Sequence, residues 1–189
     1  MSKGGVAPAR WSAPTIVLHW LSAIVIFALV ALGFLMTRFF DSATRFDLYQ
    51  LHKSFGVLAL ALLAARLLFR FAGAAPAPLG PPWERAAAAI VHGALYALTL
   101  LAILLGWLAA SSAPLPVPTI VFGLFAWPSL MGADPATFAF ASLAHRLTGY
   151  GLAMLAGLHA AAALKHALVD REGVFSRMAF GRGPGAPRR

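Results

Sequence analysis

Residues 142–166, SLAHRLTGYGLAMLAGLHAAAALKH, decide the fold. Between Arg146 and Lys165 this stretch has no Asp, Glu, Lys or Arg, and a run of about 20 such residues is long enough to cross a membrane as a helix. It also carries His145 and His159, fourteen residues apart. In an α-helix of about 3.6 residues per turn, both imidazoles then project from nearly the same face, about 21 Å apart along the axis.

Three earlier runs share this apolar character. Of the 189 residues, 60% are hydrophobic and 11% are charged, whereas a soluble domain carries about 25% charged residues. The runs predict membrane-spanning helices over residues 12–36, 49–71, 83–110 and 142–169. The sequence therefore predicts an all-α integral membrane protein, a four-helix bundle that forms a single membrane domain over residues 1–189.

The segments outside the predicted helices are rich in proline and glycine, which end helices. Residues 74–83 form a first break, and residues 111–141 form a longer one on the outer side. The middle of the longer break, residues 120–130, is apolar but too short to span a membrane, so we expect an interfacial loop. The tail, residues 170–189, is basic.

The basic side chains are distributed unevenly between the two sides of the predicted bundle. The side that holds both termini carries eleven of the fifteen Lys and Arg residues. Because positively charged loops stay in the cytoplasm, we expect both termini to be cytoplasmic. The net charge of +9 then reflects topology, and since no aromatic side chains interleave the basic ones, no nucleic-acid partner is expected. The basic residues on the outer side are Arg38, Arg45, Lys53 and Arg146.

Histidine is the natural ligand for any metal in this chain. The absence of cysteine excludes disulfides, thiolate-held iron–sulfur clusters and haem attached through C-x-x-C-H. Six histidines are present, most of them in or beside the apolar runs. Ionisable side chains at such positions are costly and often functional, although a structural hydrogen bond is the alternative for each one.

Sorted by depth in the bilayer, the histidines form pairs. His52 and His145 lie in the first turns of predicted helices that begin on the outer side, and His19 and His159 lie nearer the cytoplasm. This spacing suits two stacked haems, whereas ligands at two depths on antiparallel helices do not build one tetrahedral zinc site. The remaining two, also on the cytoplasmic side, are His92 and His166.

The two outer histidines share a local pattern. Residues 52–56 read HKSFG and residues 145–149 read HRLTG, so each histidine is followed by a cation and, one turn later, by glycine. Glycine at that place lets a flat macrocycle approach the backbone, and the cation can pair with a haem propionate. The pattern favours haem at the outer pair.

Short segments around the histidines recur in an order and spacing typical of one family. They are LHWL at 18–21, LHKS at 51–54, VHG at 91–93, AH at 144–145 and GLHAAAALKH at 157–166. RLLFR at 66–70 and VFGL at 121–124 also match. From Trp11 to Met178 the chain resembles the bacterial di-haem cytochromes b561 of the inner membrane.

The resemblance implies two b haems and a multi-pass location in the bacterial inner membrane. It implies that His52 and His145 bind the outer haem iron and that His19 and His159 bind the cytoplasmic one. Arg66, at the cytoplasmic end of its helix, is a candidate partner for a haem propionate.

Some members of this family oxidise superoxide at the outer face and reduce ubiquinone, so the resemblance implies these two substrates here. A positive rim raises the encounter rate of an anion by about 10- to 10³-fold, although the same cations could simply neutralise propionates. The quinone region would include His92 and His166. The candidates for steering superoxide are Arg38, Arg45, Lys53 and Arg146.

Two other functions remain open at this point. The chain could be the cytochrome b subunit that transfers electrons for a partner dehydrogenase or hydrogenase, although its brief soluble segments offer little docking surface. It could also be a haem-free bundle such as a transporter. The predicted helices are unbroken and carry no acidic residue at the midplane, which speaks against that class.

Overall fold

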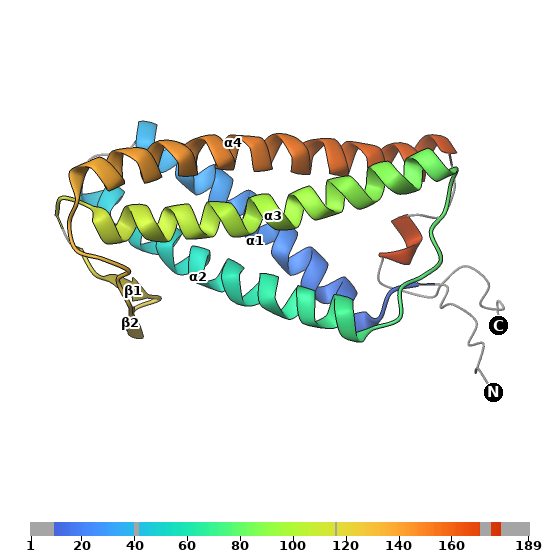
Figure 1. The fold of residues 1–189 in the computed structure, drawn as a ribbon, viewed down its shortest axis with the longest axis horizontal. Coiled ribbons are helices and arrows are strands. Elements are labelled where there is room, and N and C mark those ends of the chain that lie inside the picture. Colours follow the sequence, from blue (N-terminus) through green and yellow to red (C-terminus); the bar gives the residue numbers. More distant parts are fainter. Residues whose placement is uncertain (1–9, 40–41, 116, 171–174, 179–189) are drawn as a thin grey trace.

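Four long helices run the length of the molecule (Figure 1). The computed structural model describes residues 10–39, 42–115, 117–170 and 175–178. The helices are α1 (Ala13–Arg38), α2 (Ser42–Ala72), α3 (Pro82–Ser112) and α4 (Pro135–Lys165). All four are long and apolar enough to cross a membrane. The predicted four-helix membrane bundle is therefore confirmed, while both ends of the predicted domain lie outside the described residues.

Two helices begin earlier than predicted. α2 starts at Ser42 and not at position 49, and α4 starts at Pro135 and not at position 142. Asp134 caps α4, because its Oδ1 accepts a 2.8 Å hydrogen bond from the Thr137 N–H, and proline at the first helical position is already shaped for a helix. The prediction was wrong because it began each helix where the apolar run begins.

The helices pack as two pairs, α1 with α2 and α3 with α4, and α2 also contacts α3. Much of the apolar surface faces outward, as at Phe71, which is 84% exposed, and Ile90, which is 72% exposed. Such a surface is suited to hydrocarbon, where polar groups must be satisfied within the protein. The buried Ser22 follows this rule, because its hydroxyl donates to the Leu18 carbonyl at 2.7 Å.

The outer loop contains a β-hairpin that was not predicted. β1 (Thr119–Val121) pairs antiparallel with β2 (Phe125–Trp127). The turn between them uses Phe122 and Gly123 at φ values of 48° and 76°, the backbone that tight hairpins require. β-branched and aromatic residues on both sides of a glycine were the available signal.

We call the end of the bundle where α1 begins and α4 finishes the cytoplasmic end, following the distribution of charge, and the opposite end the outer end. Beyond α4, the chain forms a π-helical turn, η1 (His166–Asp170), and a short 3₁₀ helix, η2 (Phe175–Arg177). The indole N–H of Trp20 donates to the Met178 carbonyl at 2.7 Å. This segment therefore lies against the start of α1.

Candidate functional site

The outer pair of histidines lies well inside the bundle. His52 comes ten residues after the start of α2 and His145 ten residues after the start of α4, which is about 15 Å along each helix. Their ring centroids are 6.1 Å apart and their planes are at 89°. The structure brings the two residues together at one depth. Their predicted place in the first turn is wrong, because both helices begin earlier.

Glycines on the neighbouring helices make room for both outer rings. A Cβ atom added at Gly106 of α3 would lie 2.9 Å from Cε1 of His145. A Cβ atom added at Gly33 of α1 would lie 3.4 Å from Cε1 of His52. From the sequence alone, both glycines are simply small residues suited to helix packing. Their contact with the imidazoles was not foreseen, since it depends on how the helices are rotated.

Hydrogen bonding sets the protonation of one outer ring. Nδ1 of His145 lies 2.8 Å from the Ala102 carbonyl oxygen, which only accepts, so this nitrogen carries the proton. Nε2 then keeps its lone pair, as in histidines that bind metals while donating to a backbone carbonyl. Nδ1 of His52 is buried and has no hydrogen-bond partner among the described residues.

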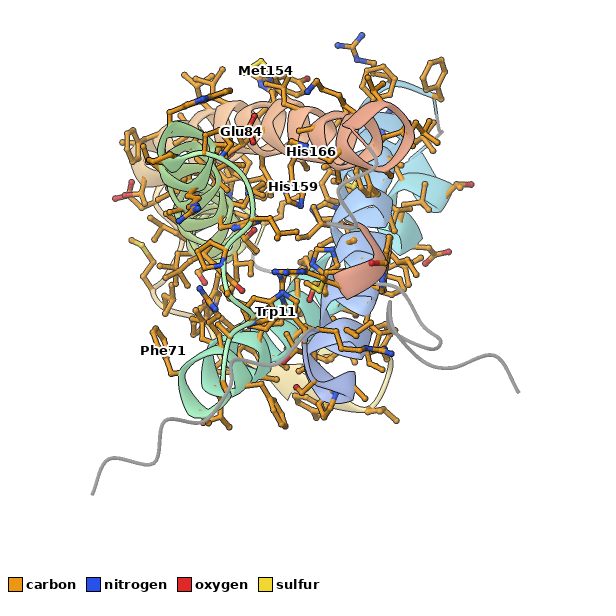
Figure 2. All side chains as sticks on the ribbon, turned by 90° about the vertical axis from the view of Figure 1, so that its right-hand side faces the viewer. Trp11, Phe71, Glu84, Met154, His159 and His166 are labelled. Carbon is orange, nitrogen blue, oxygen red and sulfur yellow. The ribbon has the colours of Figure 1, made fainter. Side chains whose placement is uncertain are left out.

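Three histidines gather at the cytoplasmic end. His159 points from α4 toward the middle of the bundle (Figure 2). Its ring centroid lies 6.3 Å from that of His19 on α1 and 5.2 Å from that of His92 on α3. From α2, Nη2 of Arg66 lies 3.2 Å from Nδ1 of His19, and the guanidinium lies 5.1 Å from the centroid of the Tyr96 ring. All four helices thus contribute to this cluster.

His166 lies seven residues beyond His159, about 10 Å farther along the helix axis. It begins η1, where α4 changes into a π-helical turn. Such turns frequently occur at functional sites. The structure therefore places His166 beyond the three-histidine cluster, closer to the cytoplasmic end of the bundle.

The ring separations test whether haem fits these pairs. Two imidazoles that bind one metal from opposite sides, each through a nitrogen at about 2 Å, have centroids roughly 6 Å apart. The separations of 6.1 Å and 6.3 Å meet this requirement, but the 5.2 Å between His92 and His159 is too short. A Cβ added at Gly56 or Gly149 meets nothing within 4 Å, which leaves space for a macrocycle. Both predicted pairs fit haem.

Other metal sites find no support in the described part of the chain. No group of three or more His, Cys, Asp or Glu side chains there could hold a metal ion. Among the three cytoplasmic histidines, His19 and His159 stand at a separation at which they would hold one haem iron, and His92 is a closer neighbour of His159.

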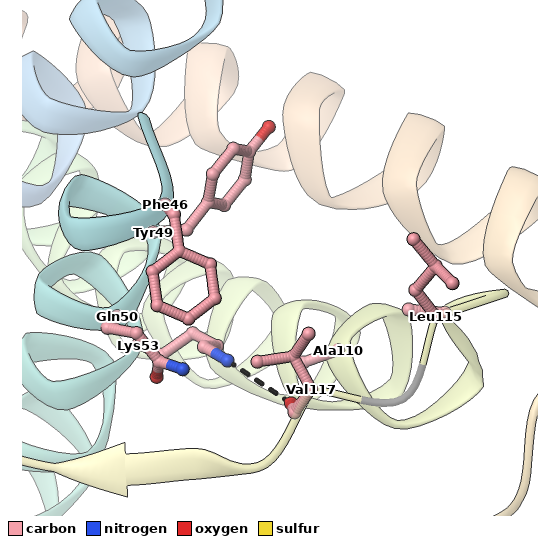
Figure 3. Close-up of a pocket in the computed structure, with 8 residues that line it drawn as sticks. Phe46, Tyr49, Gln50, Lys53, Ala110, Leu115 and Val117 are labelled. Carbon is pink, nitrogen blue, oxygen red and sulfur yellow. Dashed lines mark hydrogen bonds between the residues drawn. The ribbon is translucent and has the colours of Figure 1, made fainter. Parts of the chain in front are cut away.

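Lys53, which follows His52, lines a cavity of about 200 Å³ at the outer end (Figure 3). The cavity lies between α2, α3 and the loop that follows α3. The ammonium nitrogen of Lys53 lies 3.4 Å from the Pro118 carbonyl oxygen and 3.5 Å from that of Val117. The remaining walls are mainly apolar, so this lysine is the charged group of the cavity.

The other predicted outer cations lie at separate places. Arg146 follows His145 and is exposed. Arg38 ends α1, with its guanidinium 4.6 Å from the centroid of the Phe34 ring. Arg45 is exposed in the first turn of α2. Of the four, Lys53 and Arg146 are adjacent in sequence to the outer histidine pair.

Two comparisons relate this chain to known proteins. Residues 10–181 match the family model of prokaryotic cytochrome b561. The chain is also 32% identical over 174 residues to the cytochrome b561 homolog 2 of Escherichia coli (strain K12). That alignment covers 90% of this chain and 92% of the relative.

Proposed function

The chain belongs to the prokaryotic cytochrome b561 family and is therefore a bacterial membrane protein that transfers electrons through haem b. From this premise we propose that it holds two b haems in the inner membrane. His52 and His145 hold the outer haem iron in this proposal. His19 and His159 hold the cytoplasmic one.

The observation that carries the proposal is the arrangement on α4. This helix presents His145 and His159 on nearly one face, and each meets a second imidazole at the separation that one metal requires. The two ligands are about 21 Å apart along the helix. When bound, haem iron supplies one-electron transfer, and α4 fixes the levels at which this chemistry is available on the two sides of the bilayer.

Arg66 is proposed to pair with a propionate of the cytoplasmic haem. A guanidinium only donates, so Nδ1 of His19 accepts the hydrogen bond from Arg66 and Nε2 carries the ring proton. A neutral imidazole that binds metal through Nε2 needs that proton on Nδ1. Ligation by His19 therefore requires Arg66 to turn away from the ring, which frees its guanidinium for a carboxylate.

We propose superoxide as the electron donor at the outer end and ubiquinone as the acceptor at the cytoplasmic end. Two superoxide anions release one electron each and leave as O₂, and one ubiquinone takes up two electrons and two protons. Lys53 and Arg146 attract the anion toward the outer pair, helped by Arg38 and Arg45 at the helix ends.

The quinone is proposed to bind near His92 and His166. His92 is in ring contact with His159 but too close to it to share one iron, so it is available for another ligand. His166 lies at the π-helical turn, about two turns beyond His159 toward the cytoplasmic end. His92 and His166 together form a polar route from the cytoplasmic ligand pair, His19 and His159, to the membrane surface.

The first test is the haem-to-protein ratio of the detergent-purified protein, with its reduced-minus-oxidised spectrum. We expect two non-covalent b haems in the wild type and one in His52→Ala. Leu51→Ala serves as the matched control, because Leu51 is exposed and adjacent to His52 on α2 but is not a proposed ligand. A protein that binds no haem under ample haem supply refutes the cytochrome proposal.

The second test concerns the donor and the acceptor. Protein reconstituted with ubiquinone is supplied with a superoxide source outside the vesicles, and quinol formation is followed with and without superoxide dismutase. Dismutase-sensitive quinol formation supports the proposal. A haem-loaded protein that reduces quinone only with a co-purified dehydrogenase or hydrogenase indicates a partner-dependent subunit instead.

A further inference from the structure

The outer β-hairpin carries no charge and exposes large apolar side chains. From position 111 to position 133 the sequence contains no Asp, Glu, Lys, Arg or His. At the tip, Leu124 is 80% exposed, Phe125 is 51% exposed and Phe122 is 45% exposed. A contiguous apolar surface of this kind marks a contact with a protein or a membrane.

Side chains of α2 bind the backbone of β1. The Gln50 amide donates to the Pro118 carbonyl at 2.9 Å and accepts from the Ile120 N–H at 3.4 Å. The Ser54 hydroxyl lies 3.2 Å from the Ile120 carbonyl oxygen and accepts from the Phe122 N–H at 3.0 Å. Gln50 and Ser54, one helical turn apart, thus provide the hydrogen bonds that a neighbouring strand would otherwise make to this edge of β1. Backbone groups on this edge therefore need no water.

The turn packs against the same helix. Phe122 has a φ of 48°, which is uncommon for a bulky residue and persists where the surroundings enforce it. Its ring packs edge-on against Phe55 of α2, with the centroids 5.3 Å apart. The apolar tip is thus joined to α2 through the Phe122 ring.

The charge pattern of α2 gives the depth of the hairpin. Arg45, Asp47 and Lys53 precede Ser54, and no charged residue follows until Arg66. Ser54, which binds β1, therefore lies where the charged outer part of α2 gives way to its apolar part. The hairpin lies beside the outer part of α2, and not beyond the ends of the helices (Figure 1).

Two tryptophans, one in the hairpin and one beside it, lie where the charged outer part of the bundle gives way to its apolar part. The Trp107 and Trp127 ring centroids are 5.5 Å apart, and the Trp107 indole donates to the Pro128 carbonyl at 2.8 Å. Tryptophan is enriched where hydrocarbon meets the headgroups. The hairpin thus continues the lipid-facing surface of the bundle at that boundary.

We propose that the hairpin Thr119–Trp127 inserts into the outer leaflet of the bilayer, with phospholipid as the partner of its apolar tip. The acyl chains cover Leu124 and Phe125, while Gln50 and Ser54 satisfy the edge of β1. Insertion also fixes the preceding loop, whose carbonyls at Val117 and Pro118 bind Lys53. The proposal is independent of which substrate the protein uses.

The absence of native cysteine allows a direct test. Leu124→Cys carries a nitroxide spin label in the full-length protein, held in nanodiscs of phosphatidylcholine and phosphatidylglycerol. Ala133→Cys is the matched control, because it is exposed in the same loop but precedes the charged Asp134. Spin relaxation is measured with O₂, which concentrates in lipid, and with a water-soluble nickel chelate.

Insertion predicts that the O₂-to-nickel accessibility ratio at position 124 exceeds that at position 133 severalfold. Equal ratios at both positions overturn the proposal, because the tip is then in water. Low accessibility to both reagents at position 124 also overturns it, because protein then covers the tip. Phe125→Cys repeats the measurement if the first variant does not fold, and unchanged helix content by circular dichroism verifies each protein.

Discussion

The outer and cytoplasmic histidine sites differ in how the surrounding helices accommodate the rings. At the outer site, a carbon added at Gly106 would press on the His145 ring, and one added at Gly33 would just touch the His52 ring. At the cytoplasmic site, a Cβ added at Gly93 or at the glycine two residues before His159 meets nothing within 4 Å. At the outer site, glycines without a Cβ atom therefore make the room that the two rings occupy.

The cytoplasmic site is instead shaped by additional polar groups. His92 and Arg66 stand beside the facing pair there, whereas His52 and His145 form a simple pair. The outer site, a closely packed pair of imidazoles, suits electron transfer alone. A site with surplus polar groups suits a reaction that also needs protons, as quinone reduction does. The following predictions test this contrast, from the largest expected effect to the smallest.

His145→Ala is expected to abolish the outer site and to leave the cytoplasmic one intact. The variant removes an imidazole whose Nδ1 is already bound to the Ala102 carbonyl. Haem content should fall to half of the wild-type value, measured against protein concentration. Loss of all haem with unchanged helix content would show that the two sites are not separable as described.

His19→Ala and His92→Ala are expected to differ sharply. Only His19 stands at the distance from His159 that one iron requires. His19→Ala should therefore lose half of the haem, while His92→Ala should keep all of it and lose quinone reduction. Equal loss of haem in the two variants would contradict the assignment of the facing pair.

Gly106→Ala is expected to disturb the outer site more than Gly33→Ala does. The added methyl group would lie 2.9 Å from the ring of His145 in the first case and 3.4 Å from that of His52 in the second. Overpacking typically costs about 1–3 kcal/mol. Reduced occupancy of the outer haem, with a normal cytoplasmic haem, is the expected spectrum of Gly106→Ala. Gly132→Ala is the control and should behave as wild type, because an added Cβ there meets nothing within 4 Å and the residue lies in the outer loop, outside the helices that carry the histidines.

Arg146→Gln is expected to have the smallest effect, a slower reaction with superoxide and no loss of haem. A single exposed cation contributes to attraction over a distance, and salt screens that contribution. The difference from wild type should shrink as ionic strength rises. Arg85→Gln, the same change at the cytoplasmic end, is the control. A salt-independent defect would point to a contact and not to steering.

Much of the architecture was readable from sequence. Four apolar runs of sufficient length, the uneven distribution of cations and the fourteen-residue spacing of His145 and His159 are properties of the chain in one dimension. They predicted the bundle and the pairing of histidines by depth, while the orientation in the membrane stays a prediction. The start of α4 was misplaced because capping by Asp134 is a local polar signal that hydrophobicity does not detect.

Only the tertiary structure decided which side chains meet across helices. The contact of Gly106 with His145, the closeness of His92 to His159 and the binding of β1 by Gln50 depend on how each helix is rotated and set against its neighbours. Sequence periodicity states which residues share a face, but in a chain that is apolar on nearly every face it does not state which face turns inward. Packing in three dimensions supplies that choice.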